Sequence, residues 1–95
     1  MDQKIQLTHP AGKKGVSIDK GKYDVLKKAI INCLKTKGES TNSELLQSIT
    51  EDFKKGKIKF EGSLAWYLEW VKLDLEAGKE IRRAGNKSPV KYVIN

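Results

Sequence analysis

The sequence is poor in the residues that build covalent or metal-based frameworks. Its 95 residues include one cysteine and one histidine, too few for an internal disulfide or a structural zinc site of the usual Cys/His type. No apolar run approaches the roughly 20 residues of a transmembrane helix, and the N-terminus lacks the apolar core of a secretory signal. We therefore expect a cytoplasmic protein without a metal, a cofactor or a membrane partner.

Positive charge is what the sequence has in excess. Nineteen Lys and Arg residues stand against twelve Asp and Glu, for a net charge of +7 and a pI of about 9.5. Such a balance favours an anionic partner such as nucleic acid, but it bears on association rather than on fold. The length suits one small domain, and a hydrophobic share of 38% argues against disorder of the whole chain.

Two amphipathic helices are predicted in the first half of the chain. The first covers residues 20–37, with Asp19 as N-cap and Gly38 as the stop signal. The second begins after Thr41, where ThrAsnSerGlu forms a capping box with Glu44. Helical spacing predicts the buried side chains: Tyr23, Leu26, Ile30, Cys33 and Leu34 in the first, and Leu45, Leu46, Ile49 and Phe53 in the second.

A third helix, over residues 62–77, is apolar on two sides. One stripe is Leu64, Tyr67, Leu68, Val71 and Leu75; the other, nearly opposite, is Trp66, Trp70, Leu73 and Ala77. Glu69, Lys72 and Glu76 fill a polar strip between them, with Lys72 and Glu76 spaced for an i,i+4 pair. A helix of this kind is normally buried between two layers.

The chain ends in a predicted β-hairpin, with strands at 80–84 and 89–94 joined through GlyAsnLysSer. Glu39 and Ser40 are spaced to pair with it as a short strand. Three helices followed by a basic hairpin predict an α+β fold of the winged helix-turn-helix type, and another α+β arrangement of the same elements is the alternative. Residues 19–95 form this single domain, and residues 1–18 form an irregular N-terminal arm packed on it.

Basic residues gather in two places that are candidates for contact with nucleic-acid phosphates. The hairpin, or wing, carries Arg82, Arg83, Lys87 and Lys91, and the connection before the third helix carries Lys54, Lys55, Lys57 and Lys59. Each cluster also has a simpler interpretation. Charged residues on an exposed strand discourage edge-to-edge association, and a lysine-rich connection is often only a solvated loop.

The third helix, by contrast, is poorly suited to read bases. Residues 61–78 hold one lysine against four acidic residues, and they contain no Arg, Asn or Gln. Those are the side chains best suited to bidentate contacts with base edges. We therefore expect any nucleic-acid contact to be directed at the backbone and largely non-specific.

The Trp66, Trp70, Leu73 and Ala77 stripe needs a second cover. A homodimer seam or a groove for a protein partner is one possibility, and burial under the arm around residues 7–10 is the other. Trp66, Tyr67 and Trp70 also have the character of a stacking platform for unpaired bases, although aromatics at helical spacing more often belong to a core.

No catalytic constellation can be assembled. His9 is the only histidine, and no Ser or Cys nucleophile stands at a spacing that would serve it. Cys33 falls on the buried face of the first helix and is interpreted as a core residue. We expect a protein that is not an enzyme.

Several motifs together resemble a small uncharacterised bacterial family of winged-helix-like domains. They are HisProAlaGlyLys at 9–13 and GlySerLeuAlaTrpTyr to GluAla at 62–77, the pattern GSxxWYxExVKLDLEA. In that family an Arg-Gly or similar pair follows GluAla, whereas Gly78 and Lys79 stand here. The resemblance implies the fold and a bacterial cytosolic setting, and it supplies no activity. The leading hypothesis is thus non-specific DNA binding, and the alternative is a protein-interaction or homodimerisation module.

Overall fold

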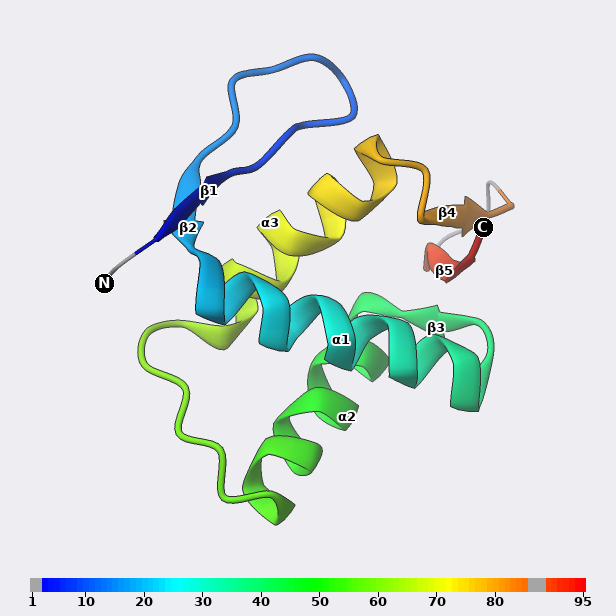
Figure 1. Cartoon of the computed structure of the whole chain (residues 1–95). Helices are drawn as coiled ribbons and strands as arrows, with labels where there is room; N and C mark the ends of the chain where they lie inside the picture. The colour runs from blue at the N-terminus through cyan, green and yellow to red at the C-terminus, as the bar shows by residue number, and fades with distance from the viewer. Residues whose placement is uncertain (1–2, 86–88) are drawn as a thin grey trace.

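The structure is a computed structural model that describes residues 3–85 and 89–95, and it has a mixed α+β fold (Figure 1). Three helices are accompanied by two small antiparallel sheets. In chain order the elements are β1 (Lys4–Gln6), β2 (Ser17–Asp19), α1 (Lys20–Lys37), β3 (Ser40–Thr41), α2 (Asn42–Lys55), α3 (Leu64–Ala77), β4 (Ile81–Ala84) and β5 (Lys91–Ile94).

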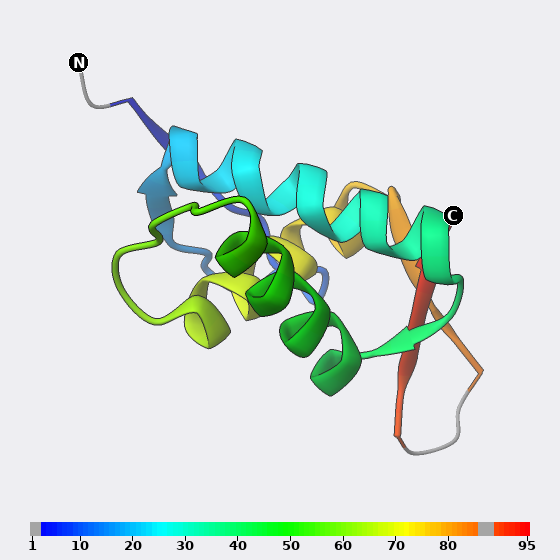
Figure 2. The same cartoon turned by 90° about the horizontal axis from the view of Figure 1, so that it is seen from below.

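Helix α1 runs along the length of the molecule, and the other elements are arranged around it (Figures 1 and 2). The β1–β2 hairpin lies at its N-terminal end, and the sheet of β3, β4 and β5 lies at its C-terminal end. Both α2 and α3 pack against it. The core is formed where these helices meet, and Leu26, Ile30, Leu45, Val71 and Leu75 are fully buried there.

Both ends of α1 and the start of α2 lie where the sequence signals placed them, whereas α3 begins at Leu64 and not at the predicted residue 62, because Ser63 is its N-cap. The Asp19 carboxylate accepts a hydrogen bond from the Lys22 amide at 3.0 Å, and the Gly38 amide donates to the Leu34 carbonyl in a backbone with φ 77°. The capping box is complete, because the Glu44 amide donates to Thr41 Oγ1 at 3.1 Å and the Thr41 amide donates to Glu44 Oε1 at 2.9 Å. These local predictions are confirmed.

The second sheet has the strand order β3-β5-β4, all antiparallel. The short strand after α1 is confirmed one residue later than expected: Ser40 and Thr41 pair with Tyr92 and Lys91. The central position of β5 follows from this, since it pairs with β4 on its other side. Pro89 precedes β5, as a residue without an amide donor requires.

The N-terminal segment is more regular than predicted, since strands form near both ends of the predicted irregular arm. Residues 4–6 and 17–19 form a two-stranded antiparallel hairpin in which Ile5 faces Ile18. Leu7 follows β1 and is buried, with its amide donating to the Val16 carbonyl at 2.8 Å. These apolar side chains order the segment because they pack on the helical core, an effect too distant in sequence to show as periodicity.

Lys72 is the clearest departure from the expected helix faces. It was predicted to lie in a polar strip and to pair with Glu76, yet its side chain is only 2% exposed. Its Nζ donates to Asn42 Oδ1 at 2.6 Å and to Glu69 Oε2 at 3.0 Å, and lies 4.5 Å from the centroid of the Tyr92 ring. Glu76 pairs instead with Arg83. Lys72 adjoins the buried Val71 and Leu75 on the helix, and α2 and β5 enclose it.

Candidate nucleic-acid interface

The loop lysines stand at the C-terminal end of α2 and in the connection that follows. Lys54 and Lys55 end the helix, and all four members (Lys54, Lys55, Lys57 and Lys59) are exposed. The loop is held against the helix end, because the Ile58 amide donates to the Phe53 carbonyl at 2.8 Å. Within the described part of the chain, none of the four takes part in an ion pair. They present a concentrated positive charge that no ion pair in the described structure engages.

A chain of aromatic rings leads from this loop across the start of α3. Neighbouring ring centroids lie between 5.0 and 6.4 Å apart. In order, the rings are those of Phe53, Phe60, Tyr67, Trp66, Trp70 and His9. Lys22 Nζ lies 4.6 Å from the Tyr67 centroid and donates to the Glu61 carbonyl at 2.8 Å. The aromatic chain therefore joins the lysine loop to the N-terminal segment, a connection that helical spacing alone does not reveal.

The GlySer pair before α3 has a local structural reason. Gly62 has φ 94°, and a Cβ built on it would lie 3.0 Å from the Tyr67 ring. Glycine is the residue that adopts this backbone without strain. Ser63 then caps the helix, its Oγ accepting from the Trp66 amide at 3.2 Å. These two residues therefore contact Tyr67 and Trp66 in the first turn of α3.

The N-terminal segment crosses α3 and covers part of the tryptophan stripe. The Thr8 amide donates to Asp74 Oδ1 at 2.8 Å, and the His9 ring meets Trp70 edge to face at 6.2 Å. Trp70, which His9 contacts, is half-buried, as are Leu73 and Ala77, whereas Trp66 remains 45% exposed. Of the two predicted covers, the N-terminal segment is the one observed; it contacts Trp70 through His9 and leaves Trp66 exposed.

The positive charge of the hairpin is less concentrated than the sequence predicts. The register pairs Arg82 with Val93 and Lys91 with Ala84, which places Arg82 and Lys91 on one face of the sheet. Arg83 lies on the other face, where its Nε is 3.3 Å from Glu76 Oε2. Lys87 lies outside the described residues. The predicted wing cluster is thus divided between two faces and partly neutralised.

The loop and the hairpin lie at opposite ends of α1 (Figures 1 and 2). The loop follows α2 near the N-terminal end of α1, and the hairpin pairs with β3 beyond its C-terminal end. The two predicted basic clusters are therefore separate surfaces. A ligand that uses one of them does not reach the other without spanning the molecule.

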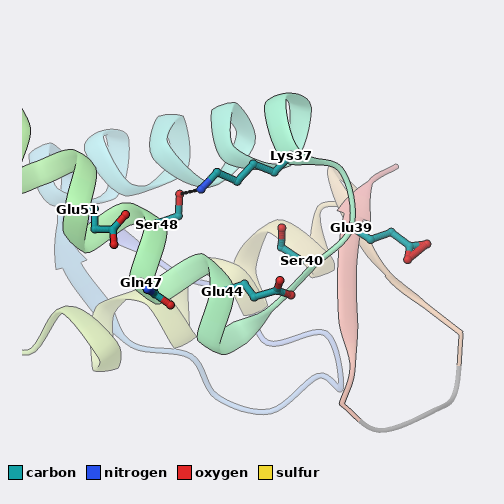
Figure 3. A pocket seen from close by; sticks show the side chains of 7 residues that line it. All are labelled: Lys37, Glu39, Ser40, Glu44, Gln47, Ser48 and Glu51. Carbon is teal, nitrogen blue, oxygen red and sulfur yellow. Dashed lines mark hydrogen bonds between the residues drawn. The ribbon is translucent and has the colours of Figure 1, made fainter.

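An acidic hollow that the sequence reasoning missed borders the sheet (Figure 3). It measures about 280 Å³ and is lined by Lys37, Glu39, Ser40, Glu44, Gln47, Ser48 and Glu51. Lys37 Nζ donates to Ser48 Oγ at 2.8 Å. Hydrogen bonds from Thr41 lower the pKa of Glu44, and the nearby Lys91 contributes to that shift. Because three glutamates face solvent here, this side of the molecule is unfavourable for phosphate.

The architecture defines a small α+β protein with three helices and two antiparallel sheets. A family model described as a family of unknown function (DUF6958) matches residues 4–92, and the chain belongs to this family. The match begins with β1 and ends within β5, so it includes the first hairpin, all three helices and β4. A comparison with curated proteins finds no match.

Neither a membrane-spanning helix nor a cluster of metal ligands is found among the described residues. Over residues 3–85 and 89–95, no helix is long and apolar enough to cross a bilayer. In the same part of the chain, no three His, Cys, Asp or Glu side chains are grouped as metal ligands would be.

Proposed function

We propose that this protein is a winged-helix binding module, not an enzyme, that contacts the nucleic-acid backbone non-specifically. The order of helices and strands supports the class: a short strand after α1 joins a hairpin after α3 in a sheet of order β3-β5-β4. That is the arrangement expected of three helices and a wing. The long connection between α2 and α3, residues 56–63, is the main difference from a tight helix-turn-helix.

The proposal is carried by the exposure of the loop lysines Lys54, Lys55, Lys57 and Lys59 and by their lack of ion pairs among the described residues. When lysines of this kind bind the phosphates of a nucleic acid, they release the counterions condensed on it, which favours binding at low salt. The hairpin contributes less, because Arg83 is engaged by Glu76 and Lys91 lies beside Glu44.

A salt series tests this assignment. Log affinity for a nucleic acid should fall linearly with log salt, by about 0.7–0.9 per phosphate contact. The quadruple variant K54A/K55A/K57A/K59A should lose about 2–4 from that slope. The matched control K35A/K79A/R82A/K91A removes the same charge at the hairpin end, and it should keep most of the slope. Absence of binding at low salt refutes the proposal, and an equal loss in both variants refutes the loop as its site.

A second candidate rests on Trp66 alone. An indole that is 45% exposed at the start of a helix is typical of a contact made with another protein, and the partner that this candidate assigns to it is a second copy of the chain. Light scattering over a range of concentrations would then show a dimer that W66A converts to a monomer. A monomer at all concentrations removes this candidate and leaves the first intact.

A further inference from the structure

We infer, on the basis of the function proposed above, that the ligand is single-stranded nucleic acid and that Trp66 is the surface on which an unpaired base stacks. Trp66 would thus contact a base, not only the backbone, and the protein would distinguish single strands from duplexes. The exposed apolar side chains and the loop lysines lie on the same part of the surface.

The large hydrophobic side chains that are exposed in the described structure lie around the lysine loop. They are Val25, Ile58 and Trp66. Val25 and Ile58 line a shallow hollow together with Lys59 and Phe60. Trp66 adjoins the loop through Tyr67, whose ring is 5.2 Å from Phe60. Phosphates alone make no apolar contacts. A strand with unpaired bases offers phosphate charges to the lysines and π-faces to the apolar side chains.

Trp66 is held in place but not covered. Its amide is capped by Ser63, and its ring meets Tyr67 at an interplanar angle of 83° and Trp70 at 54°. Neither neighbour is therefore stacked parallel on the indole. The Lys22 ammonium over Tyr67 fixes the adjoining ring. A rigid aromatic side chain with an open surface is what base stacking requires, since little conformational entropy is lost on binding.

The same region is unsuited to a duplex. Helix α3 is crossed by the N-terminal segment through the Thr8–Asp74 hydrogen bond and the His9–Trp70 contact, so it cannot enter a major groove as it stands. Its exposed residues include Ala65 and Glu69, which offer no bidentate contact to guanine or adenine. A duplex also keeps its base faces stacked and out of reach of Trp66.

Charge complementarity extends along the aromatic chain. The loop lysines stand at the Phe53–Phe60 end, and the exposed Lys13 and Lys14 follow His9 in sequence. A strand that placed a base on Trp66 would thus have the loop lysines within reach of its phosphates. We expect the bound strand to follow the order of the rings, from the loop towards the N-terminal segment.

The experiment compares a labelled oligothymidylate of about 15 nucleotides with a duplex of the same length, by fluorescence anisotropy at low salt. Wild-type protein should bind the single strand at least about tenfold more tightly than the duplex. W66A should lose about tenfold or more of single-strand affinity with its duplex affinity unchanged, while W66F should retain most of it. Circular dichroism melts of both variants check that each is folded.

The outcomes separate the two proposals. If neither nucleic acid binds, the proposed function fails and the inference fails with it. If both bind equally, or if W66A binds the single strand like wild type, backbone binding stands and the inference is overturned. If W66A changes only the mass measured by light scattering, Trp66 serves self-association and the inference is likewise overturned.

Discussion

The Tyr23 hydroxyl donates a hydrogen bond of 2.6 Å to Asp74 Oδ2. The other oxygen of the same carboxylate accepts from the Thr8 amide at 2.8 Å. One side chain of α3 therefore holds both α1 and the N-terminal segment, which lie 51 and 66 residues away in sequence. This carboxylate is the polar attachment that keeps the N-terminal segment across the tryptophan stripe.

Replacing Asp74 should loosen that attachment. D74A leaves the Thr8 amide and the buried Tyr23 hydroxyl without their acceptor, and we expect a loss of about 1–3 kcal/mol in the free energy of unfolding. Trp70 should become more accessible to a fluorescence quencher, because His9 no longer stays against it. Y23F serves as the control, since it keeps the Thr8 contact. If quenching is the same in D74A and wild type, the carboxylate does not position the segment.

Alkaline pH should weaken the fold through Tyr23. Its burial, followed by the hydrogen bond and negative charge of Asp74, raises the pKa of this hydroxyl well above its ordinary value. Between the two pKa values the unfolded chain loses the proton while the folded chain keeps it, so unfolding is favoured as pH rises above about 10. The stability is fully present below the unfolded pKa.

The measurement is a set of urea melts from neutral pH to about pH 11, compared with Y23F. Any pH effect common to both proteins cancels, so the informative quantity is the difference between them. Wild type should fall more steeply, by less than about 1.4 kcal/mol per pH unit. Parallel curves would show that Tyr23 has the same pKa in both states.

Lys72 offers a test of what a buried ammonium contributes. Its acceptors Asn42 and Glu69 are exposed, so water can replace the ammonium when it is removed. K72M preserves the aliphatic stem, and it should cost less than about 1.5 kcal/mol. K72A also opens a cavity among Val71, Leu75 and Tyr92, and it should cost about 2–4 kcal/mol. Denaturant melts that found the two variants equally destabilised would mean that charge, not packing, is what Lys72 contributes.

Gly15 is required by a close backbone approach. A Cβ at this position would lie 1.8 Å from the Leu7 carbonyl oxygen, so G15A must displace the Leu7–Val16 pairing. We expect a loss of about 1–3 kcal/mol in unfolding free energy. At Gly78 the φ is −82° and the nearest atom to an added Cβ is 3.6 Å away, so G78A is the matched control. It should stay within about 0.5 kcal/mol of wild type; similar losses in both variants would contradict the steric argument.

Features that depend on neighbours within one turn could be predicted from the sequence. The Asp19 cap, the Thr41–Glu44 box and the buried face of α1 are all confirmed, because each follows from hydrogen bonds or side-chain spacing over a few residues. The short strand before α2 could also be anticipated, since β5 offered it a partner. These local rules were enough to predict three helices and a small antiparallel sheet.

The sequence predicted which basic residues could form the candidate site, but not how the fold arranges them. The lysines of residues 54–59 were identified as one cluster, which their proximity in sequence guarantees. That Arg83 would be engaged by Glu76, while Arg82 and Lys91 share the other face, depends on strand register and on how the sheet sits against α3. The separation of the two basic clusters has the same origin, because α1 holds them at its opposite ends.

The sequence by itself determined both ends of α1, the start of α2, the apolar side chains that these two helices bury, and that positive charge is sparse in α3. Tertiary structure alone decided that Lys72 is buried, that the N-terminal segment forms a hairpin across α3, and that Trp66 stays open beside the lysine loop. The physical reason is the sequence separation over which each interaction acts. Capping and amphipathic spacing act over three or four residues, whereas burial and ion pairing depend on segments that meet only when the chain is folded.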